Sequence, residues 1–119
     1  LIVGPLSDRH GRLVYMFAGF ILSAAGFSSF SFFTIPWIYL PLTVASIGLG
    51  VFCVSSLACL NECVPATQKS TVSASYYLAW GLGYCFGPLV IGRLGGGYIV
   101  LALLMLFEAI LIFNVIKSE

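Results

Sequence analysis

The amino-acid sequence predicts an all-α membrane protein with four transmembrane helices that form part of a larger bundle. Hydrophobic residues make up 61% of the 119-residue chain and charged residues only 8%, whereas a soluble domain carries roughly 25% charged residues. The apolar residues fall into four runs of about 20 residues, the length that a helix needs to cross ~30 Å of hydrocarbon. Helices are expected rather than strands because a helix satisfies every backbone N–H and C=O within its own span.

Short segments of distinct composition separate the expected spans. Pro36 and Trp37 mark the turn after the first span, and the glycines at 95–97 mark a turn after the third. The only clearly polar linker lies between the second and third spans, at residues 61–70. The predicted spans are residues 13–33, 38–60, 72–94 and 98–116, and residues 1–12 are expected to comprise the end of a preceding helix and a loop.

The five basic side chains predict the orientation of these spans. If the chain crosses the membrane four times, Arg9, Arg12, Lys69 and Lys117 fall on one side and only Arg93 falls on the other. Cytoplasmic loops of membrane proteins carry an excess of Lys and Arg. We therefore expect a multi-pass protein of the plasma or inner membrane with both termini in the cytoplasm.

Composition and motifs argue against several functional classes. A net charge of +1 provides no basic surface for nucleic acid. The four cysteines lack the C-x-x-C spacing of metal or redox sites. The chain has one histidine and shows no nucleophile motif or phosphate-binding loop, which argues against an enzyme. We expect no metal, no cofactor and no nucleic-acid partner.

The first residues of the chain are apolar and lack both Met and the basic segment of a signal peptide. We therefore expect the chain to be a fragment of a longer polytopic protein. Its partners would then be the lipid bilayer and the remaining helices of the same protein.

A charged loop before the first span carries the most specific pattern in the chain. The spacing G-x-x-x-D-R-x-G-R is made by Gly4, Asp8, Arg9, Gly11 and Arg12. This segment resembles the cytoplasmic loop signature of the major facilitator superfamily, except that Leu13 stands where the signature has a final basic residue. The resemblance implies a twelve-helix fold in two six-helix halves, of which this chain would be a partial half-bundle.

The resemblance also implies a function. Proteins of this superfamily are secondary active transporters that move a small-molecule substrate across the membrane by alternating access, and proton-coupled efflux is one of their activities. The alternative interpretations are a truncated remnant that does not transport and a four-span membrane scaffold.

The four spans can be assigned to two positions within such a transporter. The signature loop joins helices two and three, or helices eight and nine, so the spans correspond to helices three to six or nine to twelve. The third span contains the run Gly83-x-x-x-Gly87-Pro88-x-x-x-Gly92, which resembles helix eleven. This run favours helices nine to twelve.

The residue types of the loop suit a conformational latch, which is the role that the resemblance implies. Gly4 and Gly11 allow tight turns, and Asp8 can cap the helix that follows and meet the positive end of its dipole. Arg9 and Arg12 can bind carboxylates, helix C-terminal carbonyls or lipid phosphates. The alternative is a short charged turn that only follows the asymmetry of basic residues.

The small residues of the third span predict a close contact between helices. Gly83, Gly87 and Gly92 let a neighbouring helix approach, and Pro88 removes a backbone hydrogen bond and kinks the helix. Close packing explains the run, and a flexing gate is the alternative.

Two helix faces are candidates for a substrate cavity. Tyr76, Trp80 and Tyr84 repeat every four residues and share one face of the third span, which suits an apolar or cationic solute. Ser46 and Gly50 belong to a narrow face of small and polar residues in the second span. The alternatives are an aromatic stripe packed against a neighbour or at the lipid interface, and hydrogen bonding between helices.

Glu108 is the one charge deep inside a predicted span. An ionised carboxylate is penalised at this depth unless it is protonated or paired, so an acid inside the membrane is a candidate functional residue. Glu108 is therefore a candidate proton site. In the alternative interpretation it is structural, and a protonated or hydrogen-bonded Glu108 faces a neighbouring helix.

Overall fold

The computed structural model describes residues 9, 11–93 and 97–118. Within these residues the chain forms four long helices and two short 3-10 turns. The long helices are α2 (Arg12–Ser29), α3 (Tyr39–Glu62), α4 (Lys69–Arg93) and α5 (Gly97–Ser118), and the 3-10 turns are η1 (Phe30–Phe32) and η2 (Ala66–Gln68). Each long helix overlaps one predicted span, and the predicted all-α class with four helices is confirmed.

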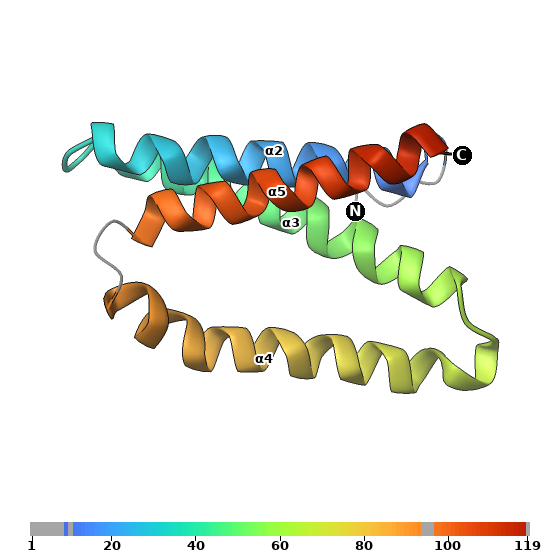
Figure 1. The fold of residues 1–119 in the computed structure, drawn as a ribbon. Helices are drawn as coiled ribbons and strands as arrows, with labels where there is room; N and C mark the ends of the chain where they lie inside the picture. The colour runs from blue at the N-terminus through green and yellow to red at the C-terminus, as the bar shows by residue number, and fades with distance from the viewer. Residues whose placement is uncertain (1–8, 10, 94–96, 119) are drawn as a thin grey trace.

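Three of the helices lie together and the fourth lies to one side (Figure 1). α2 contacts both α3 and α5 extensively, whereas α4 makes few contacts with the other helices. Consecutive helices run in opposite directions, so the starts of α2 and α4 lie at the same end as the ends of α3 and α5 (Figure 1). The longest dimension is 46 Å, which exceeds the ~30 Å thickness of the hydrocarbon layer.

The closest contact between helices involves glycines of α2 and α3. A β-carbon added to Gly48 would lie 2.6 Å from the backbone nitrogen of Ser23, and one added to Gly26 would lie 2.6 Å from that of Ala45. The Ser23 hydroxyl donates a hydrogen bond to the Gly19 carbonyl at 2.8 Å, within its own helix. The backbones of α2 and α3 therefore pack directly against each other, as they do where small residues line helix interfaces in membranes.

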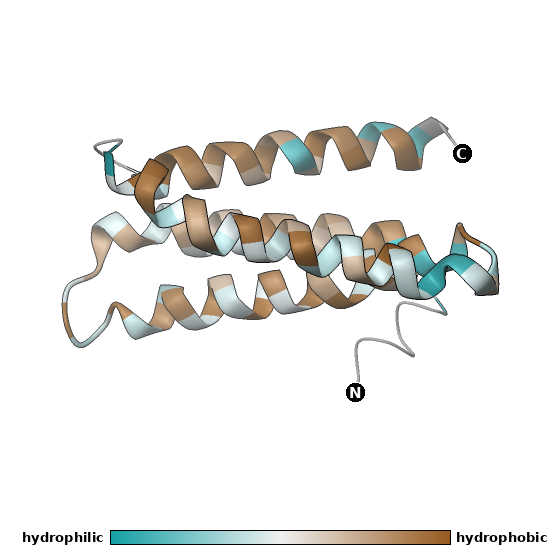
Figure 2. Ribbon diagram, turned by 90° about the horizontal axis from the view of Figure 1, so that it is seen from below, coloured by the Kyte–Doolittle hydropathy of each residue, from teal (hydrophilic) through white to brown (hydrophobic). Residues whose placement is uncertain are grey.

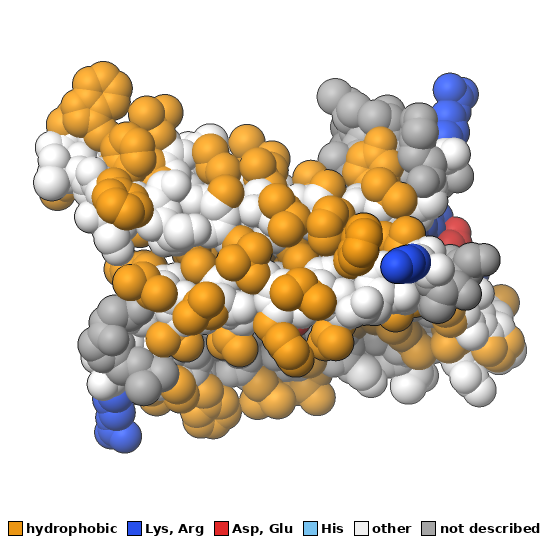
Figure 3. Space-filling model, turned by 45° about the horizontal axis from the view of Figure 1, so that its top comes forward, with side chains coloured by type: hydrophobic (Ala, Val, Ile, Leu, Met, Phe, Trp, Pro, Cys, Tyr) orange, Lys and Arg blue, Asp and Glu red, His pale blue; other side chains and the backbone are white. Residues whose placement is uncertain are grey.

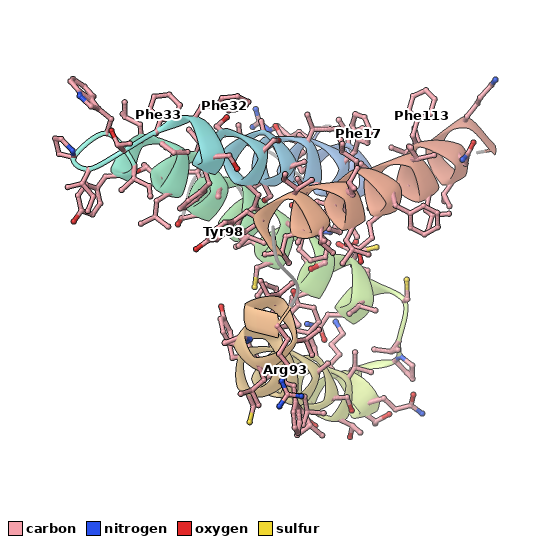
Figure 4. The ribbon with its side chains drawn as sticks, turned by 60° about the vertical axis from the view of Figure 1, so that its left-hand side comes forward. Phe17, Phe32, Phe33, Arg93, Tyr98 and Phe113 are labelled. Carbon is pink, nitrogen blue, oxygen red and sulfur yellow. The ribbon has the colours of Figure 1, made fainter. Side chains whose placement is uncertain are left out.

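Aromatic rings join α2 and η1 to α5. The ring centroids of Phe17 and Phe113 are 5.9 Å apart, and those of Phe30 and Tyr98 are 4.9 Å apart with nearly parallel rings. Figure 4 shows Phe17 and Phe113 on the neighbouring helices α2 and α5. Such aromatic pairs contribute about 0.5–1.5 kcal/mol beyond the burial of their area, so they hold α5 against the α2–α3 pair.

The four helices at the predicted spans differ in apolarity. Among the helices described, α2, α3 and α5 are long and apolar enough to cross a membrane, and α4 does not reach that apolarity. α4 begins with Lys69, Ser70 and Thr71 and contains four glycines, and its paler colours in Figure 2 contrast with those of α5. This composition suits a helix that packs among other helices rather than one that faces lipid on all sides.

Basic side chains lie at the two ends of the bundle (Figure 3). Figure 3 shows Lys and Arg side chains at both ends, with hydrophobic side chains covering most of the surface between them. Arg93 is the last residue of α4, and Figure 4 shows it apart from the layer that α2, α3 and α5 form. This distribution fits the apolar interior and polar boundaries of a bilayer.

Replacing Gly48 with Ala is expected to destabilise the protein by about 1–3 kcal/mol, because the added methyl group overpacks a contact made by backbone atoms. Gly81→Ala is the matched control, since a β-carbon at Gly81 would meet no atom within 4 Å and Ala favours a helix more than Gly does. Denaturant unfolding of the full-length protein in detergent measures both effects. A Gly48→Ala protein as stable as wild type would contradict the direct contact between the two backbones.

Candidate functional site

The predicted signature loop lies only partly within the described residues. Gly4 and Asp8 lie outside them, so their predicted roles stay predictions. Gly11 has a φ of 91° and immediately precedes α2, in a region of backbone space that glycine adopts without strain. Arg9 is exposed. The turn into α2 is therefore made at one of the two glycines that the loop pattern singled out.

Arg12 forms a two-pronged ion pair with Glu62 at the end of α3. Nε of Arg12 donates to Oε2 of Glu62 at 2.7 Å, and Nη2 donates to Oε1 at 2.5 Å. The planar guanidinium matches the two carboxylate oxygens. The Glu62 side chain is 59% exposed, so solvent screens the pair and its contribution to stability is small. The pair ties the start of α2 to the end of α3.

Sequence analysis did not identify Glu62 as a functional residue. It lies 50 positions from Arg12 along the chain, and only the antiparallel packing of α2 and α3 brings the two together. A usable signal existed, because Glu62 is the only acidic residue in the polar linker at 61–70. That linker was expected on the same side of the membrane as Arg12.

The predicted small-residue run lies on α4 and has no close neighbour there. A β-carbon added to Gly83, Gly87 or Gly92 would meet no atom within 4 Å. Pro88 lies inside α4, and the helix continues to Arg93. The predicted close contact at this run therefore stays a prediction, and it concerns helices other than those described.

The two predicted cavity faces come together in space. Ser46 and Gly50 of α3 and Trp80 and Tyr84 of α4 line one cavity of about 400 Å³, here called the α3–α4 cavity. The ring centroids of Trp80 and Tyr84 are 5.8 Å apart. Cys53, on the same face of α3, also lines it. A volume of this size falls within the roughly 300–1,000 Å³ typical of sites for small molecules.

Tyr76 connects α4 to α3. Its hydroxyl shares a hydrogen bond with the Ser56 hydroxyl at 2.7 Å and donates to the Cys53 carbonyl at 3.3 Å. A second link between these helices runs from the Ser73 hydroxyl to the Asn61 side-chain oxygen at 3.3 Å. Side-chain hydrogen bonds, rather than close backbone packing, therefore set the position of α4 against α3.

A second cavity, of about 490 Å³, is lined by residues of all four long helices and is here called the aromatic cavity. It shares Leu49, Trp80 and Tyr84 with the α3–α4 cavity. The ring of Tyr76 also lines it, 6.2 Å from that of Trp80. No Asp, Glu, Lys, Arg or His is among the residues that line either cavity. Apolar contact and ring stacking are therefore the main interactions that these two cavities offer.

Glu108 lies near the middle of α5 and lines a third, open hollow of about 370 Å³, here called the Glu108 hollow. Phe20 of α2 and Phe52 of α3 line the same hollow, with ring centroids 4.3 Å apart. Across the part of the chain that the structure describes, no hydrogen bond or ion pair to the Glu108 carboxylate is found. No described basic side chain therefore pairs with Glu108.

The model of one protein family, the Major Facilitator Superfamily, matches residues 1–118. The chain belongs to this superfamily. The resemblance carried by the Gly4–Arg12 loop is therefore confirmed, and the helices described are part of a facilitator bundle. Members of the superfamily are membrane transporters rather than enzymes. No curated protein and no solved structure matches the chain.

Reversing one charge of the Arg12–Glu62 pair is expected to lower the melting temperature of the full-length protein, because two like charges then face each other at the position of the ion pair. The double variant Arg12→Glu with Glu62→Arg is expected to recover most of the loss, since the pair can form with its charges exchanged. Lys117→Glu is the control for net charge, because Lys117 is an exposed cation in the last turn of α5.

Melting temperatures of the single and double variants are measured in detergent at low and high salt. Salt should reduce the loss in the single variants, since it screens exposed charges. A double variant that melts no higher than the single variants would contradict the conclusion that this ion pair links the start of α2 to the end of α3.

Proposed function

We propose that the chain forms part of a secondary active transporter that moves a small solute by alternating access, with the solute bound between α3 and α4. One observation carries the proposal. Two faces that were predicted separately, one on each helix, line a single cavity in a chain of the major facilitator superfamily. The proposal places the chain at helices nine to twelve, with both termini in the cytoplasm and efflux driven by protons as its mode.

The lining of the α3–α4 cavity supports a solute with an apolar or aromatic body. Trp80 and Tyr84 offer ring faces on which a flat group can stack. Ser46 donates its hydroxyl proton to the Leu42 carbonyl at 2.8 Å, so its oxygen remains available to accept a hydrogen bond from a solute. Binding energy in this cavity therefore comes mainly from the apolar area that the solute buries.

The weak attachment of α4 supports a cavity that opens and closes. α4 has no buried residue and is tied to α3 through the Tyr76 and Ser73 hydroxyls. Hydrogen bonds between side chains can exchange partners as helices shift, whereas the direct backbone contact of α2 with α3 resists movement. In this proposal α4 moves against a rigid α2–α3 pair. The run from Gly83 to Gly92 provides a packing surface for helices of the transporter other than those described.

The loop before α2 is proposed to stabilise one of the two conformations. The Glu62 side of the Arg12–Glu62 pair is exposed, and pairs that solvent reaches contribute so little to stability that they can break and re-form during a cycle. Asp8 and Arg9 belong to the same proposed latch. The pair would be intact when the ends of α2 and α3 are held together and broken when that end opens.

Cys53 is expected to react with a membrane-impermeant maleimide in a full-length transporter whose other cysteines are replaced with Ser, because its thiol lines a cavity that opens to water in turn on each side. Labelling is measured in right-side-out and in inside-out vesicles. A variant that keeps only Cys85 is the control, since Cys85 is on α4 but does not line the α3–α4 cavity. A Cys53 thiol that reacts from neither side contradicts alternating access at this cavity.

Gly50→Phe is expected to slow efflux of the aromatic probe ethidium by about tenfold or more, an effect equal to at least 1.4 kcal/mol in the transport barrier, because the new ring fills the α3–α4 cavity. Gly81→Phe is the matched control. A β-carbon at either glycine meets no atom within 4 Å, so both positions accept a side chain, but Gly81 lines neither this cavity nor the aromatic cavity. Equal effects of the two substitutions on efflux would argue that the solute binds elsewhere.

A further inference from the structure

We propose that Cys59 and Cys63 are a reversible modification site. They form a disulfide by exchange with a small disulfide such as oxidised glutathione, and the new bond releases Glu62 from Arg12. The inference goes beyond the proposed function, because it concerns control of the chain by thiol chemistry and needs no bound solute.

The two thiols meet on one face at the end of α3. Cys63 is the residue that caps α3, and its backbone N–H donates to the Cys59 carbonyl at 3.2 Å. Residues four apart are neighbours on the surface of a helix. The two side chains interact directly, and both are free thiols. The C-x-x-C spacing that usually indicates a redox pair does not detect two cysteines joined by one helical turn.

The two cysteines differ in exposure. Cys63 is exposed, and Cys59 is half-buried. Cysteines that respond to oxidation are accessible to solvent and often lie next to a second cysteine that completes the disulfide. Cys63 therefore meets the reagent first, and Cys59 is the second cysteine.

The exchange balances with one small disulfide as the oxidant. The thiolate of Cys63 attacks one sulfur of the reagent, which breaks its S–S bond and releases one thiolate. Cys59 then loses its proton and attacks Sγ of Cys63, which releases the second thiolate and closes the bond between the two cysteines. The protein loses two electrons and two protons, and the reagent gains them and leaves as two thiols.

Closing this disulfide changes the backbone in the last turn of α3. The β-carbons of residues four apart in a helix are separated by about 5–6 Å, whereas a disulfide holds them about 3.5–4.5 Å apart. The end of a helix can accommodate the difference. Cys63 has a ψ of −8°, compared with about −42° in a regular α-helix, so it already departs from helical geometry.

Glu62 lies inside this turn, directly before Cys63. Its two carboxylate oxygens accept hydrogen bonds of 2.7 and 2.5 Å from the Arg12 guanidinium. A two-pronged contact depends on the orientation of both groups, and the Glu62 side of the pair is exposed, so little free energy opposes its opening. A backbone change beside Glu62 therefore releases the start of α2 from the end of α3.

The strain of the bond makes the modification reversible. Strained or exposed disulfides are more easily reduced than structural ones, and they are the labile or regulatory ones. In the orientation proposed above, this end of α3 faces the cytoplasm, where disulfides are rare and those that form are transient or sense oxidation. The pair is therefore reduced under ordinary conditions and oxidised when small disulfides accumulate.

The test uses the full-length transporter in detergent, with every cysteine except Cys59 and Cys63 replaced by Ser. The protein is incubated with oxidised glutathione, its free thiols are counted with a maleimide, and the peptide that contains both residues is analysed by mass spectrometry. We expect both thiols to be lost together and the peptide to lose the mass of two hydrogen atoms. Dithiothreitol should restore both thiols.

Two variants are matched controls. One keeps only Cys63, and the other keeps Cys63 and Cys85, which are both exposed. Cys85 lies 16 residues after Lys69, the first residue of α4, which is about 24 Å along the helix. Both controls are expected to retain glutathione as mixed disulfides, because neither has a second thiol within reach.

Hydrogen exchange measures the release of Glu62. Residues 16–18 carry the first amides of α2 that bond within the helix, and they are not part of the turn that the disulfide closes. We expect oxidation to speed their exchange about twofold to fivefold, as loss of an exposed ion pair would. Glu62→Gln in the reduced protein should have the same effect there, and residues 45–48, where α3 packs against α2, should be unchanged.

Two results would overturn the inference. In the first, glutathione remains on Cys63 while Cys59 stays free, which would mean that the two thiols do not react with each other. In the second, the disulfide forms but exchange at residues 16–18 is unchanged, which would mean that Glu62 stays bound to Arg12. Neither measurement involves transport, so either failure leaves the proposed function untouched.

Discussion

The direct contact between the backbones of α2 and α3 is the constraint on which the rest of the structure depends. Lipid provides no hydrophobic force between helices, so helices in a membrane associate through close packing and hydrogen bonds. Gly26 and Gly48 allow that packing, because no β-carbon separates the two backbones at these positions. Gly50 lies two residues after Gly48, about 200° around the helix. Packing Gly48 against α2 therefore turns Gly50 away from α2 and toward the cavity.

α4 is held by side-chain hydrogen bonds rather than by direct backbone packing. It has a polar start, glycines along its length and no buried residue, and its links to α3 are hydroxyl hydrogen bonds made by Tyr76 and Ser73. A helix held in this way leaves room for a cavity on the side that faces α3, and it can shift without breaking a close-packed core. The same features explain why α4 is less apolar than the three helices that are apolar enough to span a membrane.

Two carboxylates in the chain have opposite environments. Glu62 lies at a helix end, exposed, with both oxygens bound by the Arg12 guanidinium. Glu108 lies near the middle of a helix and lines an open hollow whose other lining residues are apolar. The Glu62 carboxylate is paired within the chain and helps to join the end of α3 to the start of α2. The Glu108 carboxylate has no partner among the described residues, so it needs a proton, a cation or a group from elsewhere in the transporter.

The sequence by itself determined the helical fold class, the number of helices and the family. Apolar runs of about 20 residues indicate membrane helices, because a membrane strand needs only about ten residues, and the Gly4–Arg12 loop has a spacing specific enough to identify the superfamily. It also identified Ser46, Gly50, Trp80 and Tyr84 as cavity candidates, because regular spacing places residues on one face of a helix. Only the tertiary structure decided that these faces meet, that Arg12 pairs with Glu62, and that glycines of α2 and α3 make a close contact between backbones. Spacing along the chain determines which side chains share a face of one helix. Packing between residues far apart in the chain determines which faces of two helices meet.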